Sequence, residues 1–243
     1  MVNLKQYKEI NDLNLEDFNG LTDYKIQVVS IFYDLDPEDV NDFAISKVKE
    51  MYQFIDNWYQ KHNNYTKDFI EVNGIIYEKM PFNNMTLGEF IDAEFYFFND
   101  VFSLIPLFYR IKEKVEHNQG DKFEPYGNFI NVRKELFMDV KAEDVMGLIK
   151  QYQEFRGHII NSNSDKFVSK PEEDDKEAEK LMTKSELKEY HNELRKEKER
   201  QKYSWERLVM DLCNNDITKF NDVLSLPVIM VFNIINMLSI SNK

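Results

Sequence analysis

Residues that commonly ligate metals or move protons are spread along this chain without the spacing of a known site. Its four histidines, His62, His117, His158 and His191, stand far apart. None belongs to an H-E-x-x-H pattern, in which one helical turn brings two imidazoles to the same metal ion. The seven glycines form neither a phosphate-binding loop nor a dinucleotide-binding fingerprint. The sequence therefore predicts no metal site and no cofactor.

The remaining candidates for chemistry are one thiol and several carboxylates. Cys213 is the single cysteine, and no base adjoins it in the sequence, which favours a small core residue over a nucleophile. The pairs Asp92 with Glu94 and Asp139 with Glu143 could act as acid and base. Acidic residues at helix starts and on solvated faces are common in this chain, however. We therefore expect no catalytic residue.

A β-hairpin is the best-specified element that could position other residues. Asn73-Gly74, the dipeptide that best tolerates positive φ at both turn positions, stands between β-branched and aromatic residues over 69–72 and 75–77. Two strands alone are rarely stable in water, so the hairpin should pack on the helices beside it.

A helix is expected directly after the hairpin. Thr86 and Glu89 have the spacing of a capping box, in which each side chain bonds the other residue's backbone N–H. Pro106 should then break or bend the run, because proline lacks an N–H donor and crowds the preceding turn, with the helix resuming at Leu107. The expected buried stripe is Phe90, Ile91, Phe95, Phe98 and Phe102, with Glu89, Asp92 and Asp100 on a solvated face.

The aromatic residues of this region are either core or contact residues. Residues 95–98 are all aromatic and cannot all face one side of a helix, so some should meet a second surface. Core packing is the competing explanation for most of the series. The candidates for partner contact are Phe97, Phe98, Phe108 and Tyr109 here, Leu187, Tyr190 and Leu194 further on, and Trp205 near the C-terminus.

Composition divides the chain into four segments. Residues 1–62 form an N-terminal helical segment, in which Asp36 and Pro37 predict a capped helix start. Residues 63–162 hold the hairpin and a helical core, and residues 204–243 form a small C-terminal helical unit. The buried stripe expected in the first segment is Phe43, Val48, Met51, Tyr52, Ile55 and Tyr59.

The segment between them, 163–203, is dominated by Glu, Lys and Arg. Thr183 and Glu186 form a second capping-box pattern, and acidic residues precede basic ones, as the helix dipole prefers. A long exposed helix or helical linker is the favoured interpretation, and a short coiled-coil contact is the alternative. The fold class is thus mainly α, with one small hairpin, a charged helical linker and a C-terminal helical unit.

Composition also limits the classes of partner. The formal charge of −13 opposes a general nucleic-acid surface, since phosphate contacts need clustered Lys and Arg. The apolar run from 226 to 240 is short and interrupted by Pro227, Asn233 and Asn236, so no membrane anchor is expected. The single cysteine and an N-terminus without a signal-peptide core favour a reducing cytoplasm.

Several short stretches together resemble a known group of proteins. They are Leu21–Lys25 leading to Ser30–Phe32, Glu71–Gly74 with Tyr77, Met85–Asp92, Leu104–Arg110 and Leu212–Leu226. This pattern resembles small helical proteins encoded among the virion structural and tail-assembly genes of tailed bacteriophages. Pro106, the charged segment, and Asn215 in place of a glycine are departures from it.

The resemblance implies a non-enzymatic protein that acts as an assembly chaperone or as a component of the particle. Its partners would be other phage structural proteins or a second copy of itself, in the host cytoplasm during assembly or in the virion. The contrasting hypothesis is a small acidic enzyme or regulator with a carboxylate-lined pocket. A DNA-mimicking inhibitor is a weaker third, because Lys and Arg are interleaved with the acidic residues.

Overall fold

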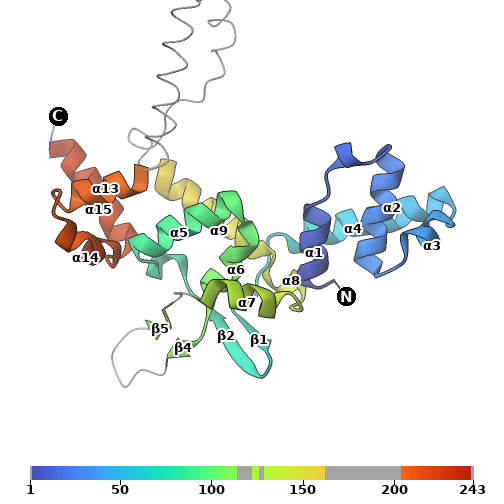
Figure 1. The fold of residues 1–243 in the computed structure, drawn as a ribbon, viewed down its shortest axis with the longest axis horizontal. Coiled ribbons are helices and arrows are strands. Elements are labelled where there is room, and N and C mark those ends of the chain that lie inside the picture. The colour runs from blue at the N-terminus through green and yellow to red at the C-terminus, as the bar shows by residue number, and fades with distance from the viewer. Residues whose placement is uncertain (1, 114–121, 126–128, 162–203, 242–243) are drawn as a thin grey trace, which may run out of the picture. The chain divides into compact units, whose positions relative to one another are not determined.

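The structure is a computed structural model that describes residues 2–113, 122–125, 129–161 and 204–241. It is mainly helical with small antiparallel sheets, which confirms the predicted fold class (Figure 1). Two compact units make up the chain: unit 1 comprises Met1–Phe82 and Ala93–Arg156, and unit 2 comprises Asn83–Asp92 and Gly157–Lys243. The charged linker predicted over 163–203 lies outside the described residues.

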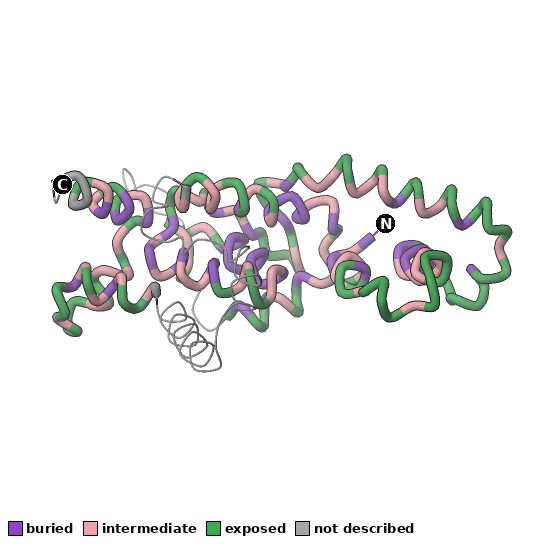
Figure 2. Tube along the Cα trace, turned by 90° about the horizontal axis from the view of Figure 1, so that it is seen from above, coloured by how far each residue is buried: buried purple, intermediate pink, exposed green. Residues whose placement is uncertain are grey.

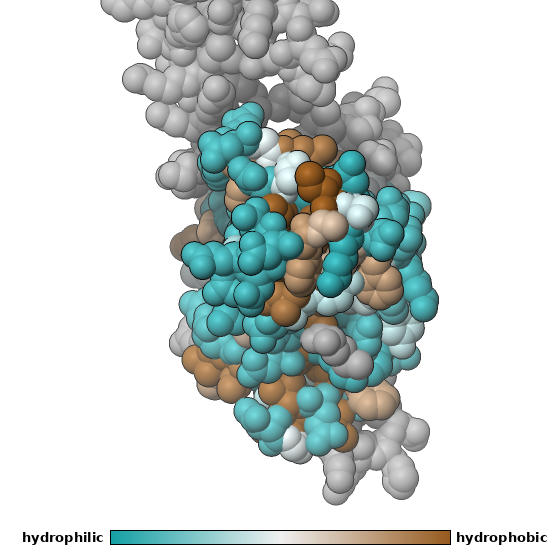
Figure 3. Space-filling model, turned by 90° about the vertical axis from the view of Figure 1, so that its right-hand side faces the viewer, coloured by the Kyte–Doolittle hydropathy of each residue, from teal (hydrophilic) through white to brown (hydrophobic). Residues whose placement is uncertain are grey.

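Unit 1 begins with helices α1 (Leu4–Asn11), α2 (Leu21–Tyr33), α3 (Pro37–Asn41) and α4 (Ile45–His62), with the 3₁₀ turn η1 (Leu15–Asp17) between the first two. The predicted helix start is confirmed, because Asp36 accepts a hydrogen bond from the Glu38 N–H and Pro37 occupies the first helical position. On the face of α2, α3 and α4 that Figure 3 presents, hydrophobic residues gather in a strip between hydrophilic ones.

The stripe predicted along α4 faces the core of this part of unit 1. Val48 and Ile55 are buried there against Val28 and Val29 of α2, and Tyr52 and Tyr59 pack on the same cluster. Figure 2 shows the buried residues of unit 1 where its helices face one another and the exposed residues along their outer edges. The period of 3.6 residues thus identified the correct face of this helix.

The hairpin is confirmed with the predicted turn. Strands β1 (Phe69–Val72) and β2 (Ile75–Lys79) pair antiparallel, with Val72 opposite Ile75. Asn73 and Gly74 have φ of 52° and 78°, as a two-residue turn of this kind requires. A third strand, β3 (Tyr109–Arg110), pairs with β2, so the helix expected to resume after Pro106 ends at Phe108 instead. Strands β4 (Lys112–Glu113) and β5 (Lys122–Phe123) form a separate pair.

The other helices of unit 1 follow the hairpin in the chain. They are α5 (Leu87–Asn99), which begins in unit 2, then α6 (Leu104–Phe108), α7 (Ile130–Phe137), α8 (Ala142–Val145) and α9 (Gly147–Asn161), which ends in unit 2; 3₁₀ turns η2 (Phe82–Asn84) and η3 (Val101–Ser103) flank α5. Every residue of α6 is buried. Pro106 is accommodated because it lies in the first turn of this short helix, where an intrahelical donor is not needed.

The face predicted to be buried on α5 is partly wrong. Phe95 and Phe98 are 61% and 67% exposed, whereas Ala93 and Glu94 are buried. Glu89 was expected on the solvated face, but it is also buried. The structure gives the Glu94 carboxylate two partners inside unit 1 and turns the two aromatic rings outward.

Unit 2 contains α13 (Ser204–Leu212), the 3₁₀ turn η5 (Ile217–Lys219), α14 (Phe220–Leu224), α15 (Val228–Ser241) and the start of α5. The Thr86–Glu89 capping box is confirmed, with the two reciprocal hydrogen bonds at 2.8 and 3.2 Å. Cys213 is buried, as predicted for a core residue. The ring of Phe90 packs edge to face on those of Trp205 and Phe232, at 5.4 and 5.7 Å between centroids.

Candidate functional site

The candidate site lies on the second half of α5, where aromatic side chains are exposed or half-buried beside an arginine of α9. We name it the α5 surface and define it as Phe95, Phe97, Phe98 and Arg156. The rings of Phe97 and Phe98 meet edge to face with centroids 5.2 Å apart. The Arg156 guanidinium, from α9, lies 5.5 Å from the centre of the Phe97 ring and 4.9 Å from that of Phe98. These distances are within the range of cation–π attraction.

A buried ion pair holds the base of the α5 surface. Both Glu94 carboxylate oxygens accept from Arg156 Nε, at 2.8 and 2.9 Å, and Tyr152 donates its hydroxyl hydrogen to Oε1 at 2.9 Å. The Glu94 side chain is 6% exposed and that of Arg156 is 25% exposed. Burial, reinforced by the Glu94 charge, raises the pKa of Tyr152. The hydroxyl therefore stays protonated and remains a donor to Glu94.

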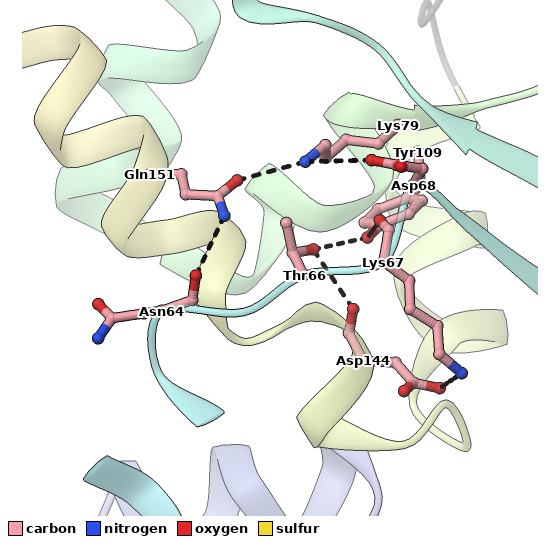
Figure 4. Close-up of polar contacts among 8 residues, drawn as sticks. All are labelled: Asn64, Thr66, Lys67, Asp68, Lys79, Tyr109, Asp144 and Gln151. Atoms are coloured by element: carbon pink, nitrogen blue, oxygen red, sulfur yellow. Dashed lines mark hydrogen bonds and ion pairs between the residues drawn. The ribbon is translucent and has the colours of Figure 1, made fainter. Parts of the chain in front are cut away.

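A second polar network, shown in Figure 4, fixes the segment between α4 and β1 on the rest of unit 1. The Tyr109 hydroxyl donates to the Lys67 carbonyl at 2.5 Å, which leaves it to accept from the Thr66 hydroxyl at 2.7 Å. The Lys67 ammonium in turn pairs with the Asp144 carboxylate of α8 at 2.9 Å. At the other end, Gln151 of α9 joins Lys79 to the Asn64 carbonyl, each at 3.3 Å. Every one of these groups has a structural partner.

An aromatic cleft opens elsewhere in unit 1, between α1 and the facing sides of α2 and α4. It has a volume of about 780 Å³. One wall is aromatic, with the Phe32 ring meeting those of Tyr33, Phe54 and Trp58 edge to face. The opposite wall comes from the polar side of α1. Phe54 is 55% exposed, so the aromatic wall of this cleft is a further apolar surface available to a partner.

The residues predicted for partner contact differ in their exposure to solvent. Phe98 is exposed and Phe97 is half-buried, both on the α5 surface. Phe108 and Tyr109 are completely buried in unit 1, so they are core residues and cannot line an exposed surface. Trp205 is half-buried against Phe90 within unit 2. Leu187, Tyr190 and Leu194 lie outside the described residues.

Sequence reasoning missed the ion pair beneath the α5 surface. Its members are 62 residues apart, and no local pattern joins them. One signal was available, because Glu94 follows Phe90 by four residues and therefore shares its helical face. Phe90 was rightly predicted to be buried, so Glu94 was a candidate for a buried carboxylate that needs a cationic partner.

The contrasting hypothesis of a carboxylate-lined pocket stays a prediction. The carboxylates lining the aromatic cleft, Glu9 and Asp34, are exposed, and Glu94 is held by Arg156 and Tyr152. Within the described ranges, no three His, Cys, Asp or Glu side chains are grouped to hold a metal ion. None of the described helices combines the length and the apolar character needed to cross a bilayer.

Comparison of the chain with protein-family models, with curated proteins and with solved structures finds no match.

Proposed function

We propose that this protein works by binding other proteins, as a virion-associated or tail-assembly protein of a tailed bacteriophage. The observation that carries the proposal is the α5 surface, where Phe95 and Phe98 are 61% and 67% exposed on a helix whose opposite face is buried. The bacteriophage context rests on the sequence resemblance described above.

Physical chemistry supports a contact function for these rings. Burying an exposed aromatic side chain against a partner is favourable by about 1.5–3 kcal/mol. Aromatic residues and arginine are enriched at the centres of protein interfaces, where a few of them supply most of the binding energy. The α5 surface combines both residue types.

The ion pair beneath the rings favours recognition by a rigid surface. Because Arg156 bonds Glu94 and lies over Phe97 and Phe98, its guanidinium limits the rotamers that these rings can adopt. Binding to a partner would then cost these side chains less conformational entropy than it would if they rotated freely.

The direct test is to follow the protein through phage assembly. As a virion component it should occur in purified particles in a fixed copy number, measured by quantitative mass spectrometry. As a chaperone it should co-purify with an unassembled structural protein and be absent from particles. Absence from both would refute the proposal.

A pair of variants tests whether the α5 surface makes the contact. Phe98→Asp should weaken partner binding at least about tenfold, as replacing an interface anchor does. Phe69→Asp is the matched control, since Phe69 is similarly exposed, at 58%, on strand β1. Equal binding by the two variants would exclude the α5 surface as the contact.

A further inference from the structure

A small apolar pocket lies where α2, α3 and α4 meet in unit 1, apart from both the α5 surface and the aromatic cleft. Its volume is about 280 Å³, just below the range of about 300–1,000 Å³ typical of pockets for drug-sized ligands. Its apolar lining is Leu21, Ile26, Phe43, Ile45 and Val48. We name it the α2–α4 pocket. Its size suits one or two side chains of a partner.

The described residues leave the rim of the α2–α4 pocket unfilled. Leu21 and Ile45, the first residues of α2 and α4, are 55% and 63% exposed although they line an apolar pocket. They begin two of the helices whose face in Figure 3 carries a strip of hydrophobic residues between hydrophilic ones. A bulky apolar side chain entering the pocket would cover both.

The charged side chains that line the α2–α4 pocket are positive, in contrast to the net charge of −13 of the whole chain. Lys25 and Lys49 line it, and no carboxylate of the described residues does. The Lys47 ammonium lies 3.8 Å from the centre of the Phe43 ring, which is itself part of the lining. Within the described residues none of these lysines forms an ion pair. An incoming carboxylate would therefore find cations that are not already neutralised.

From this combination we propose that the α2–α4 pocket binds a segment of another protein that carries one bulky apolar residue flanked by Asp or Glu. The apolar side chain enters between Leu21 and Ile45, and the flanking carboxylates pair with Lys25 and Lys49. This adds a second, chemically defined contact to the protein-binding function proposed above, and it does not require the α5 surface to be used.

An anionic membrane is the less favoured occupant. The pocket matches a side chain in size, and a net charge of −13 repels a surface of anionic lipids beyond the immediate reach of three lysines. Self-association through this pocket would likewise bring two strongly acidic chains together.

The test uses a random displayed peptide library selected on the full-length protein and counter-selected on Ile45→Asp. Position 45 begins α4 and is exposed, so an aspartate there suits the positive end of the helix and should not impair folding. Ser46→Asp, which adds the same charge at the neighbouring exposed residue outside the lining, is the matched control. Circular dichroism and thermal unfolding verify that all variants fold.

The expected outcome is enrichment of peptides with a bulky apolar residue next to acidic ones. By fluorescence anisotropy such a peptide should bind wild type and Ser46→Asp alike and lose measurable binding to Ile45→Asp. Lys49→Glu should weaken binding roughly fivefold relative to Lys61→Glu, an exposed charge reversal further along α4, and the affinity should fall with added salt.

Three results would overturn the inference. They are peptides enriched without an acidic preference, peptides that bind Ile45→Asp as well as wild type, and a selection that yields no peptide at all. The protein could instead bind phosphatidylserine vesicles or dimerise in sedimentation experiments while no peptide binds. If Ile45→Asp abolished that behaviour, the pocket would be assigned to the membrane or to a second copy. Phe98→Asp should bind the peptide normally, so a failure here is distinguishable from a failure of the α5 surface.

Discussion

At the scale of single residues, Glu94 is the side chain whose position most needs a physical explanation. A carboxylate that is 6% exposed loses most of its hydration, at a cost of several kcal/mol unless charge and hydrogen bonds replace it. Arg156 supplies the charge and Tyr152 a neutral donor. The arrangement is more valuable for fixing Phe97 and Phe98 than for net stability, since buried ion pairs often contribute little to stability.

Replacing Arg156 by Met should therefore lower the free energy of unfolding by about 3 kcal/mol, because the buried Glu94 charge loses its counterion. Urea unfolding measures the change as a shift in the midpoint. In the double variant with Glu94→Met no charge remains buried, and most of the loss should be regained. A double variant no more stable than Arg156→Met alone would contradict the explanation that the unpaired Glu94 charge causes the loss.

Two of the phenylalanines predicted as contact residues, Phe98 and Phe108, should respond differently to truncation. Phe108→Ala should destabilise by about 3–5 kcal/mol, because Phe108 is fully buried in α6. Phe98→Ala should change the free energy of unfolding by less than about 0.5 kcal/mol, since its ring is largely exposed. Thermal unfolding of both variants checks this. A large loss from Phe98→Ala would make the α5 surface a part of the core.

At the scale of elements, the start of α9 depends on a close approach of two backbones. The Gly147 N–H donates to the Tyr65 carbonyl at 3.1 Å. A Cβ at Gly147 would lie 2.2 Å from that carbonyl oxygen, a distance that backbone atoms cannot accommodate without moving. Hydrogen bonds of the network in Figure 4 join neighbouring residues of the same two segments, Thr66 to the Asp144 carbonyl and Gln151 to the Asn64 carbonyl.

Gly147→Ala should accordingly destabilise by about 2 kcal/mol or more, through overpacking against the backbone at Tyr65. Gly157→Ala on the same helix is the matched control, because nothing lies within 4 Å of its added methyl group. That variant should gain about 0.5–1 kcal/mol from the higher helix propensity of alanine. Chemical denaturation compares the two, and similar effects would contradict the steric argument.

Some of the helices, strands and turns could be predicted from the sequence and others could not. The turn at Asn73-Gly74, the cap at Asp36 and the capping box at Thr86 were predictable because each depends on residues within a few positions of one another. Strand β3 was not, because Tyr109 and Arg110 become a strand only through pairing with β2, some 30 residues earlier. The outward side of α5 was missed because the distant Arg156 decides it.

At the scale of the whole molecule, the exposed apolar surfaces matter more than any buried group for the proposed function. The α5 surface, the aromatic cleft and the α2–α4 pocket all belong to unit 1. The candidate site was only partly predictable, since Phe98 is exposed and Phe97 is half-buried whereas Phe108 and Tyr109 are core. A hydrophobic pattern identifies apolar residues but does not by itself say whether the chain or a partner covers them.

The buried tyrosines make the stability of the whole protein sensitive to pH in the alkaline range. Desolvation raises the pKa of Tyr59, Tyr109 and Tyr152 in the folded state above the ordinary value of 10.0. Above pH 10 the unfolded chain loses these protons while the folded protein keeps them, so unfolding releases protons and becomes more favourable as pH rises. The stability contributed by these groups is thus intact below pH 10 and declines above it.

Each such tyrosine should add a slope of about −1.4 kcal/mol per pH unit to the free energy of unfolding well above pH 10. Tyr152→Phe should remove one of these contributions, whereas Tyr65→Phe, at a side chain that is 51% exposed, should leave the slope unchanged. Urea unfolding across this pH range gives the slopes, and phenolate absorbance follows ionisation. Identical slopes for the two variants would mean that the Tyr152 hydroxyl ionises in the folded protein. Ionisation would remove the hydrogen bond that helps to hold Glu94 beneath the α5 surface.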